Sequence, residues 1–212
     1  MRSYHQYCGL AKALDVIGDR WTLLIVRELL IRDRCRYTDL RVGLPGIATN
    51  LLADRLRELE EAGVVSRDEA PPPIATTLYQ LTARGRELEP VIHQIGRWGG
   101  PLVAERKKSD AFRGHWLALP IKMHLVDRMP HRPPITIQLR CGDEPIVVEV
   151  GNGEIHTRPG TVVEPDATIS GPPQLVVGVL TGKLAPGAAR TAGLKYEGNP
   201  DHLRRVVPAA GS

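Results

Sequence analysis

Aromatic residues, cysteines and long apolar runs are all scarce in this chain. Phe, Trp and Tyr make up 4% of the 212 residues, which excludes the aromatic platforms that stack single-stranded bases. The three cysteines, Cys8, Cys35 and Cys141, include no close pair, which excludes a disulfide scaffold and disfavours a cysteine-rich zinc site. No apolar run approaches a membrane span, and no apolar signal segment follows Met1. We therefore expect a cytoplasmic protein without a membrane partner.

The sequence motifs of common enzyme sites are also missing. The chain contains no G-x-S-x-G elbow, no H-E-x-x-H pair, no phosphate-binding P-loop and no G-x-G-x-x-G after a strand. The seven histidines are scattered, and a metal-binding pair would have to span Pro130. We expect no catalysis, no metal and no cofactor.

The two halves of the chain differ in composition. Residues 1–108 are dense in helix formers, whereas residues 109–212 carry short Val- and Ile-rich runs between prolines and glycines. The charged run at 105–110 separates them, so we expect two domains with these bounds and an α+β fold class. The formal net charge of +4 and pI of about 9.1 are compatible with an anionic partner but not diagnostic of one.

Hydrophobic periodicity predicts a series of helices followed by a hairpin in the first half. The expected elements are a helix from Leu10 to Ile17 ended by Gly18, a second helix capped by Asp19, helices over 37–42 and 49–62, and strands over 64–67 and 77–82. Leu52, Leu56 and Leu59 mark the buried side of the 49–62 helix. This order is that of a winged helix-turn-helix, in which one helix enters the DNA major groove beside a hairpin wing.

Arginine is concentrated around the two helices of the predicted helix-turn-helix. Six arginines stand between positions 32 and 57 against three aspartates, and arginine suits phosphate and guanine edges; a solvated helical surface remains the alternative. Asn50, Asp54 and Arg57 point outward on a helical wheel, whereas Arg55 flanks the buried stripe. The candidate DNA-binding residues are Arg36, Tyr37, Thr49, Asn50, Asp54, Arg55, Arg57, and Thr76 and Thr77 in the wing.

Several motifs of the first half closely resemble the HxlR-type branch of the MarR-like winged-helix regulators. They are Cys8, ALDVIGDRWTLLI at 13–25, RYTDLR at 36–41, LPGI at 44–47, LADRLRELEEAG at 52–63 and YQLTARG at 79–85. The resemblance covers about residues 7–100 and implies a dimeric regulator that binds double-stranded DNA. Two departures concern specificity: Ala48, Thr49 and Asn50 replace the family's serine and basic residue, and wing residues 73–77 lack an arginine.

A long apolar stripe follows the hairpin and indicates a partner surface. Its residues are Leu88, Val91, Ile92, Ile95, Trp98 and Leu102, and we expect Pro90 to kink or interrupt this helix. The resemblance favours a second subunit as the partner. A two-fold dimer would place its recognition helices about 34 Å apart and require a pseudo-palindromic operator.

The second half is expected to contain a helix over 111–127, strands over 135–139, 146–150, 154–157, 166–170 and 194–198, a helix from Pro172 to Leu180, and a final helix capped by Asp201. This order resembles the sterol carrier protein type 2 superfamily, with PDATISG at 165–171, LTGKL at 180–184 and LKYEGNP at 194–200. The resemblance implies an apolar cavity for lipid-like molecules. Candidate wall residues are Trp116, Met123, Ile137, Val148, Leu175 and Val179, with a filled core or a dimerisation module as alternatives.

The sequence thus predicts a homodimeric transcriptional regulator that acts as a repressor and whose second domain is a candidate sensor of a hydrophobic small molecule. The rival hypothesis is a carrier of hydrophobic ligands that is dimerised by its helical half. Cys8 occupies the position of a cysteine that senses oxidants in some HxlR-type proteins, but its neighbours Tyr7 and Gly9 carry no positive charge. We expect a buried, inert thiol there.

Overall fold

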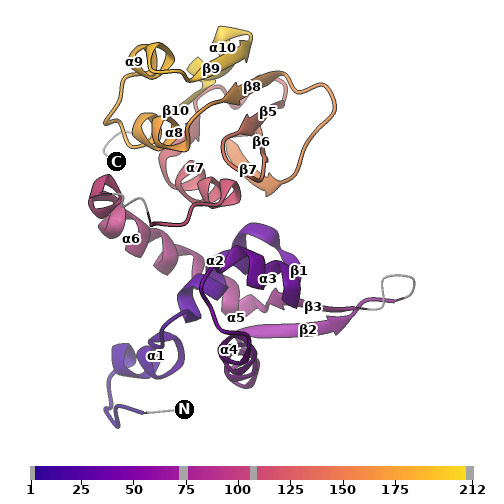
Figure 1. The fold of residues 1–212 in the computed structure, drawn as a ribbon, viewed down its shortest axis with the longest axis vertical. Helices are drawn as coiled ribbons and strands as arrows, with labels where there is room; N and C mark the ends of the chain where they lie inside the picture. Colours follow the sequence, from indigo (N-terminus) through magenta and orange to yellow (C-terminus); the bar gives the residue numbers. More distant parts are fainter. Residues whose placement is uncertain (1–2, 72–75, 106–108, 209–212) are drawn as a thin grey trace. The chain divides into compact units, whose positions relative to one another are not determined.

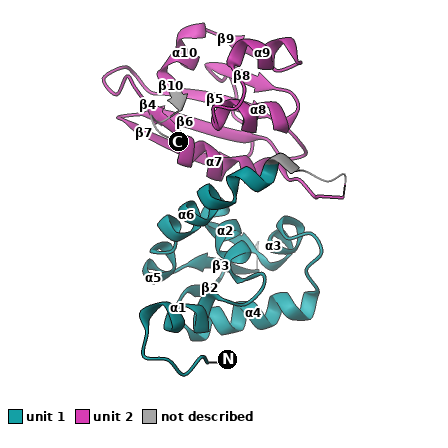
Figure 2. Cartoon of the chain, turned by 90° about the vertical axis from the view of Figure 1, so that its left-hand side faces the viewer, with its two compact units in different colours: residues 1–106 teal, residues 107–212 magenta. Residues whose placement is uncertain are grey.

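The computed structural model describes residues 3–71, 76–105 and 109–208. The chain divides into two compact units, Met1–Arg106 (unit 1) and Lys107–Ser212 (unit 2), which Figure 2 distinguishes by colour. Across the described ranges, no helix has the length and apolar character needed to cross a membrane.

Unit 1 is a winged helix-turn-helix, as the sequence predicts (Figure 1). Its elements are α1 (Gly9–Ile17), α2 (Thr22–Arg32), β1 (Arg34–Arg36), α3 (Tyr37–Gly43), α4 (Thr49–Glu61), β2 (Val65–Glu69), β3 (Thr77–Leu81), α5 (Ala83–Arg86), α6 (Glu89–Gly99) and the 3-10 helix η1 (Gly100–Glu105). The strands form an antiparallel sheet in the order β1-β3-β2. The hairpin of β2 and β3 projects past the helices as the wing.

The core of unit 1 lies between the helices and the small sheet. Leu52, Leu56 and Leu59 on α4 are buried, as their spacing predicts. Gly43, the last residue of α3, packs directly against the buried Glu28 of α2, where an added Cβ would lie 2.1 Å from the carboxylate. Arg27 donates to Glu28 at 2.7 Å, which offsets the cost of burying that carboxylate. This close approach sets the packing of α2 against α3.

Two expectations about helix ends in unit 1 differ from the structure in whole or in part. The residue that precedes α2 is Trp21, held at a φ of 80° without a side-chain capping bond, so Asp19 does not cap this helix. Pro90 lies in the first turn of α6 and not in its interior. A proline there removes only an N–H that has no intrahelical acceptor, so it does not kink α6. The helical stretch is instead interrupted before Pro90, because α5 ends at Arg86 and α6 begins at Glu89.

Unit 2 is an α+β unit built on a five-stranded sheet. Its elements are η2 (Gly114–Leu117), α7 (Ala118–His124), β4 (Leu125–Asp127), β5 (Ile135–Arg140), β6 (Ile146–Gly151), β7 (Glu154–Pro159), β8 (Ala167–Ser170), α8 (Pro173–Leu180), α9 (Pro186–Thr191), β9 (Lys195–Gly198), α10 (Pro200–Arg205) and β10 (Val206–Pro208). The sheet order is β7-β6-β5-β8-β9, with β5 and β8 parallel and the other neighbours antiparallel. The short strands β4 and β10 form a second, two-stranded sheet.

The prediction of a single helix over 111–127 was wrong. The segment forms η2, α7 and then β4, because residues 125–127 pair with β10 near the far end of the chain. Local periodicity carries no information about a pairing across such a separation. The predicted cap of the last helix also moves by two residues: the Asn199 side chain accepts from the backbone N–H of Asp201 at 3.0 Å.

A buried ion pair fastens the two-stranded sheet. Arg205 donates to both carboxylate oxygens of Asp127, at 2.8 and 2.9 Å, and to the carbonyl oxygen of Pro133 at 2.6 Å. The bidentate bond from Arg205, together with backbone N–H bonds from Met129 and Gly153, lowers the pKa of Asp127 to about 2. This pair joins the start and the end of unit 2.

Candidate nucleic-acid interface and ligand cavity

The N-termini of α3 and α4 are joined by one hydrogen bond. The Tyr37 hydroxyl donates to the carbonyl oxygen of Thr49 at 2.6 Å. Arg36 stands immediately before α3 with an exposed side chain, and its backbone N–H donates to Asp39 at 2.9 Å. No side chain caps the start of α4, where Ala48 occupies the capping position. The predicted residues Arg36, Tyr37 and Thr49 are therefore brought together at two helix starts.

The outward side of α4 carries the next three predicted residues. Asn50 is exposed in the first turn. Asp54 and Arg57 form an ion pair at 2.8 Å, with 50% and 64% of their side chains exposed. An arginine paired on its own helix offers less charge to a phosphate than a free one, so Asp54 moderates the positive charge of this surface.

The Arg55 side chain lies beside the buried side of α4, away from the outward side that carries Asn50, Asp54 and Arg57. Only 17% of its side chain is exposed, and it binds Asp19 at 2.6 Å and also Glu58. The bond to Asp19 fastens α4 to the turn between α1 and α2. These ion pairs favour a packing role for Arg55, one of the alternatives that the helical wheel leaves open.

The described part of the wing is rich in acidic contacts. Thr77 donates to Glu69 at 2.8 Å, and Asp68 accepts from Gln80 at 2.8 Å and from Arg34 at 3.1 Å. Thr76 is half-buried, and residues 73–75 of the predicted wing tip lie outside the described residues. Carboxylates repel phosphates, so Asp68 and Glu69 make the described part of the wing unfavourable for contact with a DNA backbone.

We expect Asp54→Asn to raise the affinity for any duplex by about fivefold, because it removes a repulsive charge and frees Arg57 for phosphate. The plot of log affinity against log salt should steepen by about one unit. Fluorescence anisotropy over a salt series measures both. Glu61→Gln, at the other end of the same helix, makes an equal change in net charge; an equal gain there would show that only net charge matters.

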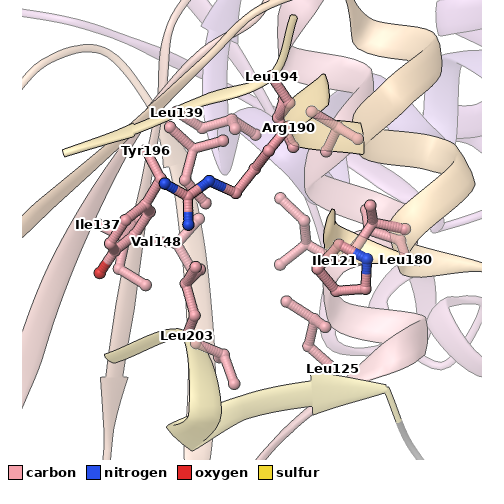
Figure 3. A pocket seen from close by; sticks show the side chains of 15 residues that line it. Ile121, Leu125, Ile137, Leu139, Val148, Leu180, Arg190, Leu194, Tyr196 and Leu203 are labelled. Atoms are coloured by element: carbon pink, nitrogen blue, oxygen red, sulfur yellow. The ribbon is translucent and has the colours of Figure 1, made fainter. Parts of the chain in front are cut away.

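Unit 2 contains an apolar cavity of about 180 Å³ (Figure 3). Its walls come from one side of β5, β6, β8 and β9 and from α7, α8, α9 and α10, with Leu125 and Val206 of the second sheet. Of the six wall residues expected from the sequence, Ile137, Val148 and Val179 line this cavity. Trp116, Met123 and Leu175 do not: Met123 is buried, and Trp116 packs edge-on against Phe112.

The three cysteines lie in different environments. Cys8 is exposed in the single chain, so the expected burial was wrong. Backbone N–H groups of Ala11 and Leu10 at the start of α1 hold the pKa of Cys8 below its usual value. Burial raises the pKa of Cys35 to about 12 and that of Cys141 to about 11, which keeps both thiols protonated.

The fold of unit 1 and its two joined helix starts define a winged helix-turn-helix protein. The family model described as HxlR-like helix-turn-helix matches residues 16–107. The uncharacterized HTH-type transcriptional regulator YvaP of Bacillus subtilis is 38% identical over 87 residues, which are 41% of this chain and 80% of that protein. The chain therefore belongs to the HxlR-like helix-turn-helix family through its N-terminal half.

Two further relatives show how far the similarity extends. The uncharacterized HTH-type transcriptional regulator Mb3122 of Mycobacterium bovis is 32% identical over 142 residues, 66% of this chain and 82% of that protein, a match longer than unit 1. The HTH-type transcriptional regulator YodB of Bacillus subtilis is 30% identical over 105 residues, 47% of this chain and 93% of that protein. The structure of reduced YodB covers 48% of this chain and 100% of that one, with a TM-score of 0.41.

Proposed function

We propose that this protein is a homodimeric transcriptional repressor that binds a pseudo-palindromic operator, with α4 in the major groove of each half-site. Repression is the simpler mode of regulation, because a dimer seated on duplex DNA blocks other proteins without any further contact surface. In this proposal unit 2 is a sterol-carrier-like sensor that binds a small hydrophobic effector. Effector binding would act on transcription only if the effector prefers one arrangement of the DNA-reading units.

The observation that carries the DNA-binding part is the junction of α3 and α4. The Tyr37 hydroxyl donates to the Thr49 carbonyl oxygen at 2.6 Å and so holds the start of α4. No capping side chain accepts from the first backbone N–H groups of α4. Such groups bind phosphate, because the helix dipole favours an anion there. Asn50 stands exposed in the same turn, where an asparagine can bind adenine through two hydrogen bonds.

Exposed apolar residues of unit 1 support the dimer. Trp98 has 79% of its surface exposed, and Ile95, Leu102 and Val103 are exposed with it along α6 and η1. A second set lies on the N-terminal segment and α1 and includes Tyr7 and Leu10. Water-exposed apolar surface of this extent is typical of a subunit interface.

Fluorescence anisotropy of the full chain against the duplex upstream of its own gene tests the proposal. We expect Asn50→Ala to cost about 1–3 kcal/mol and to relax the preference at one base pair. Arg36→Ala should weaken all duplexes alike and flatten the salt dependence by about one unit.

The control for both variants is Arg84→Ala, which removes one positive charge from an exposed position on α5. Its salt dependence and its sequence preference should equal those of the parent protein. A protein that binds no duplex at low salt would overturn the regulator and leave the carrier of hydrophobic ligands.

A further inference from the structure

The cavity of unit 2 has one chemically distinct end. Thirteen of its fifteen lining residues are apolar, and the other two are Arg190 on α9 and Tyr196 on β9. Figure 3 shows the Arg190 side chain reaching across this end of the cavity towards Tyr196, while leucines and isoleucines form the opposite wall. Among the described residues that line the cavity, none is acidic. A ligand that fills it therefore meets hydrocarbon along most of its length and one cation at one end.

The two polar side chains differ in the hydrogen bonds that they can still make to a ligand. The Tyr196 hydroxyl already donates to the carbonyl oxygen of Asn199, at 2.5 Å, and keeps only its capacity to accept. Within the described residues, Arg190 has no ion pair, and its side chain stays in contact with solvent. A guanidinium without an acidic partner binds a carboxylate through two parallel hydrogen bonds. The charge at this end of the cavity is complementary to an anion and repels an amine.

The volume limits the size of the ligand. An apolar cavity of about 150 Å³ holds a benzene molecule, and this one measures about 180 Å³. That space accommodates about six to eight apolar carbon atoms, with a charged head left at the Arg190 end in contact with water. A sterol or a long acyl chain exceeds it.

We propose that unit 2 binds a small amphiphilic carboxylate, either a single apolar ring or a chain of about eight carbons, with its carboxylate on Arg190. The apolar part lies against Ile137, Val148 and Val179 and is stabilised by the loss of its contact with water. This inference rests on the proposed sensor role of unit 2 and names the chemical class of its effector.

Isothermal titration calorimetry of the full chain tests this assignment with three probes of equal chain length: octanoate, octanol and octylamine. Octanoate should bind, octanol should bind at least tenfold more weakly, and octylamine should not bind. Arg190→Gln should weaken octanoate by about tenfold to a hundredfold and leave octanol unchanged. Lys183→Gln is the matched control, because it removes the same charge from an exposed residue that does not line the cavity.

A second variant separates the cavity from the charge. Val179→Phe fills the apolar space while Arg190 stays in place, and it should abolish binding of octanoate and octanol; circular dichroism verifies that the variant is folded. No binding of any probe up to about 1 mM would overturn the site. Equal binding of octanoate and octanol, or an Arg190→Gln protein with unchanged affinity, would overturn the carboxylate assignment.

Fluorescence anisotropy of the duplex, measured with and without each probe, tells a failure of the ligand site apart from a failure of the proposed DNA-binding function. If octanoate binds and duplex affinity stays constant, the ligand site stands and the sensor role fails. If the protein binds the duplex but none of the three probes, the DNA-binding function stands and the cavity assignment fails. A change in duplex affinity that Arg190→Gln abolishes would support both.

Discussion

Arg205→Met will lower the free energy of unfolding of unit 2 by about 3–5 kcal/mol. The substitution leaves the Asp127 carboxylate buried without the guanidinium that now donates to both of its oxygens, and it also leaves the Pro133 carbonyl without its donor. Both side chains are almost fully buried, so water cannot replace the lost bonds. Urea unfolding followed by hydrogen exchange of peptides from β5 and β6 measures the loss within unit 2.

Arg204→Met is the matched control for this variant. Arg204 stands next to Arg205 on α10, but 76% of its side chain is exposed, and its bond to Asp201 lies on the surface. Such surface pairs contribute little, so the control should change stability by no more than about 1 kcal/mol. Equal losses in the two variants would show that the buried pair has no special role.

The loss in Arg205→Met will also depend on pH. The pKa of Asp127 is lowered to about 2 in the folded chain, against about 3.9 in an unfolded one. The stabilisation is therefore complete above pH 4 and is lost as the pH falls towards 2. The difference between the parent protein and the variant should begin to shrink at a higher pH than this, because burial without the guanidinium raises the pKa of the Asp127 carboxyl in the variant, and its protonation removes the unpaired charge.

Local sequence patterns were sufficient for most of unit 1. The spacing of Leu52, Leu56 and Leu59 predicts both the length and the buried side of α4, and the glycines at 18 and 43 mark helix ends that the structure has. These features depend on residues within a few turns of each other. The winged helix-turn-helix follows from their order along the chain, and for that reason it was predictable.

Features that depend on distant residues were not predictable in the same way. A helical wheel alone does not decide whether Arg55 packs against the core or faces outward. In the structure its side chain binds Asp19, which lies 36 residues away in the sequence. Likewise β4 forms because β10 pairs with it, and Asp127 is buried because Arg205 reaches it from 78 residues along the chain. In unit 2, the replacement of the predicted long helix by η2, α7 and β4 also moved Trp116 and Met123 away from the cavity walls.

The proposed dimer on α6 predicts that the double substitution Ile95→Asp with Trp98→Asp gives a monomer and reduces the affinity for a palindromic duplex by about a hundredfold to ten-thousandfold. Residues three apart on α6 share one side of the helix, and both are exposed in the single chain. Aspartates there would place like charges opposite each other across a two-fold interface, where water cannot screen them. The two half-sites would then be bound independently, and the advantage of a linked second contact is lost.

Sedimentation velocity and duplex anisotropy measure the two effects, with Gln94→Asp as the control. Gln94 is exposed on the same helix and directly adjacent to Ile95, so Gln94→Asp adds a negative charge to this helix outside the apolar stripe. It should leave a dimer of unchanged affinity. A double variant that stays dimeric would contradict an interface on α6, and monomerisation by Leu10→Asp would then place it on α1. A half-site duplex completes the test: a folded monomer whose DNA surface is intact should bind it as well as each subunit of the parent dimer does, because neither substitution touches α3 or α4.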